Sequence, residues 1–240
     1  MKELACVNFS LWQKLLIYGR TYSLALLVEK DKIVLAVFDF FKNRRSIRTY
    51  SSKEVSKGVL FRILEATAWA PSAHNAQPWR FIVVTNAAVK RKLAENLASS
   101  WDADLNLEGV STEKRVRLTG TSIERFTNAP IVIIVCLTRE NMNRYPDKRR
   151  QKIEHIMAIQ GVAAAIENML LAVHAEGLGS CWFCAPLFCQ NTVRKVLKIP
   201  SFIEPQALIT IGYPAERLAP PKRKTVEEIA YRNFWGNLNE

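Results

Sequence analysis

Polar side chains gather in residues 70–81, in a segment that proline bounds at both ends. The polar residues are Ser72, His74, Asn75 and Gln77, and the prolines are Pro71 and Pro78. Hydroxyl, imidazole and amide groups supply both hydrogen-bond donors and acceptors, which suit the edge of a heterocycle better than they suit an ion. The prolines limit the conformations open to the segment, so these groups would be presented already ordered. A plain connector has similar residues, so the segment alone leaves a binding loop and a connector equally open.

A basic run precedes this loop, just before a predicted helix start. It contains Arg44, Arg45, Ser46 and Arg48. Planar guanidinium groups bind phosphate oxygens in a bidentate way, and like charges so close together repel one another unless an anion or solvent relieves them. A solvated basic surface has the same pattern. The phosphate site is therefore indicated by the run and the loop together.

These two segments resemble motifs of the FMN-dependent nitroreductase family. The pattern R-R-S-x-R-x-[FY] matches residues 44–50, and A-P-S-x-x-N-x-Q-P-W-x-F matches residues 70–81. A third family element, G-L-G-[ST]-C-W, matches residues 177–182. The C-terminal part of the family pattern is matched by residues 207–214 and by the basic group at 221–224. The matches follow the family order over residues 38–236 and are similar to the branch related to the C-terminal domain of coenzyme F420 glutamyl ligases.

The resemblance implies an α+β fold, a nitroreductase-like three-layer α/β/α sandwich with a central, mainly antiparallel sheet. It also implies a homodimer in which FMN lies at the subunit interface. Residues 38–240 would form the FMN-binding domain, and residues 1–37 would form an N-terminal extension. In that extension, residues 24–28 and 33–38 flank a charged stretch and fit either a hairpin or a broken helix.

The family's binding positions carry over residue by residue. The resemblance assigns the FMN phosphate, ribityl chain and pyrimidine side to Arg44, Arg45, Ser46 and Arg48, and the contacts from the neighbouring subunit to Pro71, Ser72, Asn75 and Gln77. It assigns Arg223, with Lys222 or Lys224, to a C-terminal basic site that closes on the phosphate.

The backbone around Phe183, Cys184 and Ala185 falls where the family places an amide near flavin N5. An N–H group there stabilises the negative charge of the reduced ring. The chain departs from the family at Ala73, where many members have a second serine, and at Cys184, where many have glycine. One flavin contact is therefore open to question, and Cys184 is either a passenger or an influence on substrate choice.

The implied reaction is a two-step exchange between NADH or NADPH, FMN and an electron-poor acceptor such as a nitro or quinone compound. Because a flavin carries this chemistry, no catalytic triad or carboxylate pair is expected. The histidines at 74, 155 and 174 have no recognisable partner spacing. A flavin- or F420-binding module associated with deazaflavin metabolism is the alternative function.

A zinc-binding protein is a further alternative, because Cys181 and Cys184 have C-x-x-C spacing with Cys189 nearby. Two aromatic residues fill that gap and no second C-x-x-C pair exists in the sequence, which argues against a metal site.

Composition fits one soluble cytoplasmic domain, because 240 residues with 49% hydrophobic content can bury a sizeable core. No apolar run approaches the roughly 20 residues that a membrane span needs, and no secretory signal is evident. Five cysteines without secretory context indicate reduced thiols. The net charge of +12 would attract polyanions, but the basic residues are dispersed and no nucleic-acid-binding motif accompanies them.

Hydrophobic periodicity predicts the elements that position these motifs. Strands are predicted at 80–85, 131–137 and 206–212. One helix is predicted to begin at a Ser51/Glu54 capping box and to end at residue 70, and another to begin at Asn86. Further helices are predicted over 152–176 and after a Thr225/Glu228 capping box. Small residues at 161–165 would let another helix approach closely, so helix 152–176 is expected to be central or to lie at a subunit interface.

Overall fold

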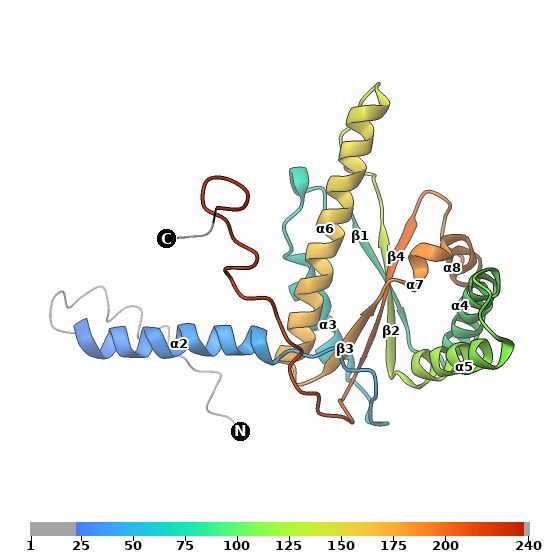
Figure 1. Ribbon diagram of the computed structural model, residues 1–240, viewed down its shortest axis with the longest axis horizontal. Coiled ribbons are helices and arrows are strands. Elements are labelled where there is room, and N and C mark those ends of the chain that lie inside the picture. Colours follow the sequence, from blue (N-terminus) through green and yellow to red (C-terminus); the bar gives the residue numbers. More distant parts are fainter. Residues whose placement is uncertain (1–22, 238–240) are drawn as a thin grey trace. The chain divides into compact units, whose positions relative to one another are not determined.

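The computed structural model describes residues 23–237. The chain divides into two compact units, residues 1–44 and 45–240. The described part of the first unit contains helix α2 (Ser23–Asn43), which is unbroken in Figure 1. The prediction of a hairpin or a broken helix is therefore wrong for these residues, and residues 1–22 lie outside the description. Glutamate and lysine are good helix formers, so the charged stretch at 29–32 continues the helix.

A four-stranded sheet forms the centre of the second unit (Figure 1). Its strands are β1 (Trp79–Val84), β2 (Ile131–Leu137), β3 (Gly179–Phe183) and β4 (Glu204–Gly212). They lie in the order β1-β2-β4-β3 with every pairing antiparallel, so β1 and β3 are the edges. The three predicted strands are confirmed, with bounds that differ by at most two residues.

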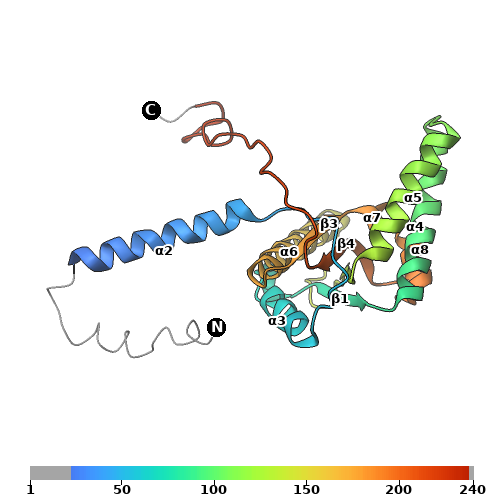
Figure 2. The ribbon, with the colours of Figure 1, turned by 90° about the horizontal axis from the view of Figure 1, so that it is seen from below.

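Helices cover both faces of this sheet (Figure 2). Helices α3 (Lys57–Ala68) and α6 (Lys148–Ala175) cover one face, and α4 (Ala87–Leu107), α5 (Thr112–Asn128) and α8 (Gln190–Leu197) cover the other. All residues of β2 are buried; Ile133 belongs to the core under α6 and Ile134 to the core under α4. The predicted three-layer α/β/α fold is confirmed.

Helix α3 begins later than the sequence pattern predicts. Its N-cap is Ser56, whose Oγ accepts a hydrogen bond from Val59 N at 3.3 Å, so the capping box at Ser51 and Glu54 is wrong. Ser51 N donates instead to Tyr213 O at 2.9 Å, because residues 50–51 run alongside the end of β4. The Asn86 cap of α4 is confirmed: its Oδ1 accepts from Val89 N at 3.1 Å.

The predicted C-terminal helix is also absent from the described residues, which form only turns at 225–237. Glu228 does accept a bond from Thr225 N at 2.8 Å, as in a capping box. However, Val226 and Ile229 are 65% and 62% exposed. A short helix is unstable without a packed apolar face, so no helix follows the capping pattern at Thr225 and Glu228.

Helix α6 begins after Asp147, four residues before the predicted start, and it is the one described helix long and apolar enough to cross a membrane. Four of its own residues, Val162, Ala165, Ile166 and Met169, are buried in the hydrophobic core. This burial is typical of a central helix in a globular domain. At Gly161 an added Cβ would lie 3.2 Å from Ser72 Cβ and 3.3 Å from Pro78 Cγ. Gly161 therefore leaves room for the polar loop of residues 71–78. The predicted approach of another helix to α6 is met by α3, since Asn168 Nδ2 of α6 lies 3.4 Å from Ala66 O of α3.

Candidate functional site

Residues 45–48 run along the free edge of β3. Ser46 forms a parallel bridge with Ser180, and Ile47 N donates to Ser180 O at 2.9 Å. A Cβ added at Gly179 would lie only 2.7 Å from Ile47 Cβ, so a glycine is needed for this close approach. The second glycine of the G-L-G element thus lets the strand bind the basic segment.

The chain that follows β4 holds the same basic segment from another side. Arg48 N and Thr49 N donate to Glu216 Oε1 at 2.9 and 3.1 Å, and Arg45 Nε donates to Leu218 O at 3.2 Å. Arg223 lies farther along this exposed part of the chain. Arg44 is the last residue of the first compact unit. Sequence reasoning missed Glu216, because its partners are main-chain amides more than 160 residues away.

Tyr50 fixes the segment from the inside. Its hydroxyl lies 2.6 Å from Ile47 O and 2.7 Å from Thr210 Oγ1 on β4. Burial raises the pKa of Tyr50 well above its ordinary value, so the hydroxyl keeps its proton and can donate. The tyrosine stands in the first family motif, but only the structure gives it a role as an anchor.

The polar loop adopts an uncommon backbone. His74, Asn75 and Gln77 have positive φ angles of 58°, 51° and 47°. This left-handed conformation costs L-residues roughly 1–2 kcal/mol each. Two hydrogen bonds to Ser72 hold it, since Asn75 N donates to Ser72 O at 3.1 Å and Gln77 N donates to Ser72 Oγ at 3.0 Å. Strained backbone maintained by such contacts is typical of binding sites.

A buried carboxylate supports this loop from α6. Glu154 is 2% exposed, and its Oε1 lies 3.3 Å from His74 Nε2. Its Oε2 accepts a hydrogen bond from Asn143 N at 3.2 Å, and Asn143 Nδ2 lies 3.1 Å from the same histidine nitrogen. The sequence showed no recognisable partner spacing for His74, because the partner lies on a helix 80 residues away.

Different elements therefore position the predicted residues. The edge of β3 holds Ser46 and its neighbours. Helix α6 contacts the polar loop at Ser72 beside Gly161 and at His74 beside Glu154, and Pro71, Asn75 and Gln77 belong to the same loop. The turn at the end of β3 forms a third place, where Cys184 precedes the short helix α7 (Ala185–Phe188).

The thiols at this turn differ in environment. Cys181 is 2% exposed within β3, whereas Cys184 is exposed beyond the strand end. Cys189 Sγ donates to Ala185 O at 3.4 Å. Among residues 23–237 no group of three or more His, Cys, Asp or Glu side chains is arranged to hold a metal ion.

Comparison with known proteins extends the likeness found in the motifs. The profile of the Nitroreductase family matches residues 41–213. A relative from Methanothermobacter thermautotrophicus, named as an NADH dehydrogenase/NAD(P)H nitroreductase, is 32% identical over 182 residues, covering 75% of this chain and 78% of the relative. An NADH dehydrogenase from Thermus thermophilus is 31% identical over 212 residues, covering 78% and 90% of the two chains.

A solved structure gives the same likeness in three dimensions. A protein from Desulfovibrio desulfuricans, assigned as a nitroreductase and solved in complex with FMN, is 30% identical to this chain with a TM-score of 0.61. The match covers 82% of this chain and 97% of the other.

Proposed function

The chain belongs to the Nitroreductase family, and we propose that it is an FMN-dependent oxidoreductase that takes electrons from NADH or NADPH. The acceptor in this proposal is an electron-poor small molecule such as a nitro or quinone compound. One observation carries the proposal: the basic segment is fixed against Ser180 at the sheet edge and held by hydrogen bonds to Glu216 and Leu218. In this proposal its arginines Arg45 and Arg48 form part of an anion site.

The donor set fits FMN. Glu216 accepts hydrogen bonds from the main-chain amides of Arg48 and Thr49, which fixes the backbone that carries the arginines. Guanidinium groups are suited to phosphate oxygens. Asn75 and Gln77 carry amide groups on a constrained loop, and amides match the alternating donors and acceptors of a pyrimidine edge.

In this proposal each cluster has a distinct task. Arg44, Arg45, Ser46, Arg48 and Arg223 hold the phosphate, ribityl chain and pyrimidine side, whereas Pro71, Ser72, Asn75 and Gln77 serve the flavin of the neighbouring subunit. The backbone at Cys184 and Ala185 supplies an N–H group to the ring. Bound FMN supplies reversible hydride acceptance, and the protein supplies orientation and electrostatics.

The proposal includes a homodimer with flavin at the interface. Helix α6 exposes Ile153, Ile156 and Ile159, at 44%, 44% and 39% exposure. Their spacing puts them on one side of the helix, and exposed apolar patches often mark interaction surfaces. We expect sedimentation to give twice the mass of the chain, and a monomer at micromolar concentration would contradict this part of the proposal.

The visible spectrum of the purified protein tests the cofactor and the donor. We expect yellow protein after incubation with FMN, and bleaching of the flavin bands by NADH or NADPH without oxygen. Bound flavin that neither nucleotide reduces would favour the deazaflavin-associated module. Failure to bind flavin, with stoichiometric zinc instead, would favour the zinc protein.

Two arginine variants locate the cofactor. Arg48→Ala should weaken FMN binding about tenfold or more, because a charge-assisted hydrogen bond contributes roughly 1.5–3 kcal/mol. Arg91→Ala is the matched control, since Arg91 pairs with Glu95 on the exposed side of α4. Equal FMN affinity in the two variants would remove Arg48 from the site.

A further inference from the structure

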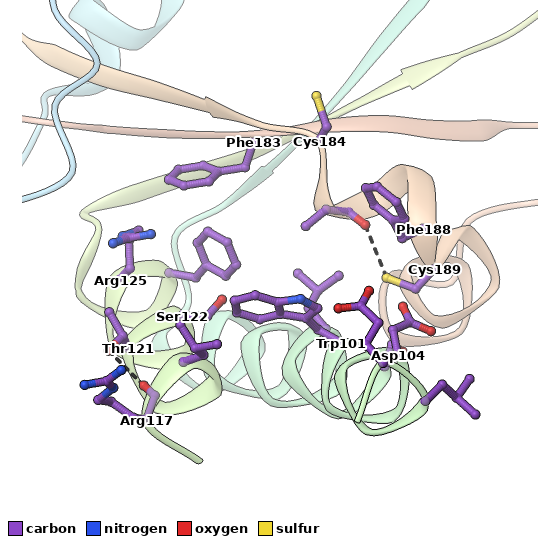
Figure 3. A pocket seen from close by; sticks show the side chains of 17 residues that line it. Trp101, Asp104, Arg117, Thr121, Ser122, Arg125, Phe183, Cys184, Phe188 and Cys189 are labelled. Atoms are coloured by element: carbon purple, nitrogen blue, oxygen red, sulfur yellow. Dashed lines mark hydrogen bonds between the residues drawn. The ribbon is translucent and has the colours of Figure 1, made fainter. Parts of the chain in front are cut away.

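A cavity of about 1040 Å³ lies between the α4–α5 pair and the turn from β3 into α7 (Figure 3). Small-molecule sites have volumes of roughly 300–1,000 Å³, so this space is sufficient for a multi-ring ligand. The residues of the basic segment and the polar loop do not line it, although Cys184 and Ala185 do. It therefore lies apart from the basic segment and the polar loop and adjoins the proposed flavin site only at the β3–α7 turn.

Aromatic rings form much of its wall. Trp101 on α4 is 39% exposed, and Phe188 on α7 is 82% exposed. Phe183 packs edge-on against Phe126, with ring centroids 5.0 Å apart. Large rings left open to solvent inside a cavity offer stacking surfaces for a flat aromatic ligand.

Charged groups occupy opposite ends of the cavity. Figure 3 shows Arg117 and Arg125 of α5 at one end, Asp104 of α4 at the other, and Trp101 between them. The guanidinium of Arg125 lies 5.7 Å from the centre of the Phe183 ring. Within the described part of the chain, neither arginine makes an ion pair, whereas the neighbouring Arg115 pairs with Asp102 at 3.0 Å.

We propose that this cavity binds a flat aromatic molecule with an acidic group at one end and an amino group at the other. The two arginines receive the acidic group, because guanidinium groups without a carboxylate partner favour an anion. Asp104 accepts a hydrogen bond from the amino group, and the rings of Trp101 and Phe188 contact the aromatic body. Each half of the ligand thus has its own recognition element.

Three probes separate these elements: an aminonaphthoate, a naphthoate without the amino group and a naphthylamine without the acid. Binding is measured by calorimetry on the full chain, with and without added FMN, so that the result does not depend on flavin binding. We expect the aminonaphthoate to bind at least about tenfold more tightly than either partial probe, since a hydrogen bond to a charged group is of that size.

Variants assign each end of the ligand. Arg125→Gln should remove the preference of the aminonaphthoate over the naphthylamine, and Asp104→Asn should reduce its preference over the naphthoate. The control Arg91→Gln lies on α4 outside the cavity lining and should change neither ratio. Equal binding of all three probes, no binding of any probe, or ratios that Arg125→Gln leaves unchanged would overturn the proposal.

Discussion

The Glu154 carboxylate lies 3.3 Å from His74 Nε2 and is almost completely buried. Glu154→Ala should lower the free energy of unfolding by about 1–3 kcal/mol, because it leaves Asn143 N without its acceptor and removes the partner of His74. Glu154→Gln keeps an acceptor oxygen, so it should lower the free energy of unfolding by less. Urea denaturation measures both, and Glu95→Ala on the exposed side of α4 is the control. Equal losses at positions 154 and 95 would show that the buried contact contributes nothing.

The close approach at Gly179 predicts a steric effect. Gly179→Ala should destabilise the protein by about 1–3 kcal/mol, the usual range for overpacking, and should weaken FMN binding because Ile47 must move. Gly120 in α5 has no atom within 4 Å of an added Cβ. Gly120→Ala should instead stabilise by roughly 0.5–1 kcal/mol through its helix propensity. Thermal melts measure the stability of both variants, and FMN titrations measure their affinity for FMN. A Gly179→Ala variant as stable as the unchanged protein would contradict the observed packing.

Tyr50 predicts a pH dependence at alkaline pH. Its folded-state pKa is raised by burial above the unfolded value of about 10, so its contribution to stability is complete below about pH 10 and is lost as the pH rises toward the folded-state pKa. Tyr50→Phe should cost about 1–3 kcal/mol at neutral pH. The difference between the two proteins in urea unfolding should shrink above about pH 10, and a constant difference would exclude Tyr50 as the source.

The cysteines should differ in reactivity. Cys184 is exposed, whereas Cys136 is fully buried in β2, where burial raises its pKa to about 12. Because the thiolate is the reactive form, iodoacetamide should modify Cys184 in the native protein and Cys136 only after denaturation. Peptide mass spectrometry reports each site, with Cys184→Ser as the control. Rapid native labelling of Cys136 would mean that the sheet opens readily.

Sequence patterns correctly predicted those elements that depend only on residues close together in the chain. The β-branched run of β2 and the Asn86 cap of α4 needed only neighbouring residues, and both are confirmed. The capping boxes at Ser51 and Thr225 were equally good local patterns. The first failed because Ser51 N donates to Tyr213 O, just after β4, and the second because Val226 is left exposed, without an apolar surface to pack on.

The supporting contacts of the candidate site were beyond sequence reasoning. The motifs identified the loop and the basic segment, but Glu154 and Glu216 meet them across 80 and 168 residues. The cavity beside Trp101 is lined by residues of α4, α5 and α7 together, which no single segment encodes. In the homodimer that we propose, placing the flavin contacts would also depend on a second subunit.

The left-handed residues of the polar loop set thermal stability against the proposed ligand binding. Glycine would adopt the backbone of positions 74, 75 and 77 with less strain, yet the chain has histidine, asparagine and glutamine there. A laboratory selection for heat resistance alone would therefore favour glycine at these positions, and in the proposed function that change would weaken flavin binding. Retaining these side chains under such a selection would require a simultaneous demand for activity.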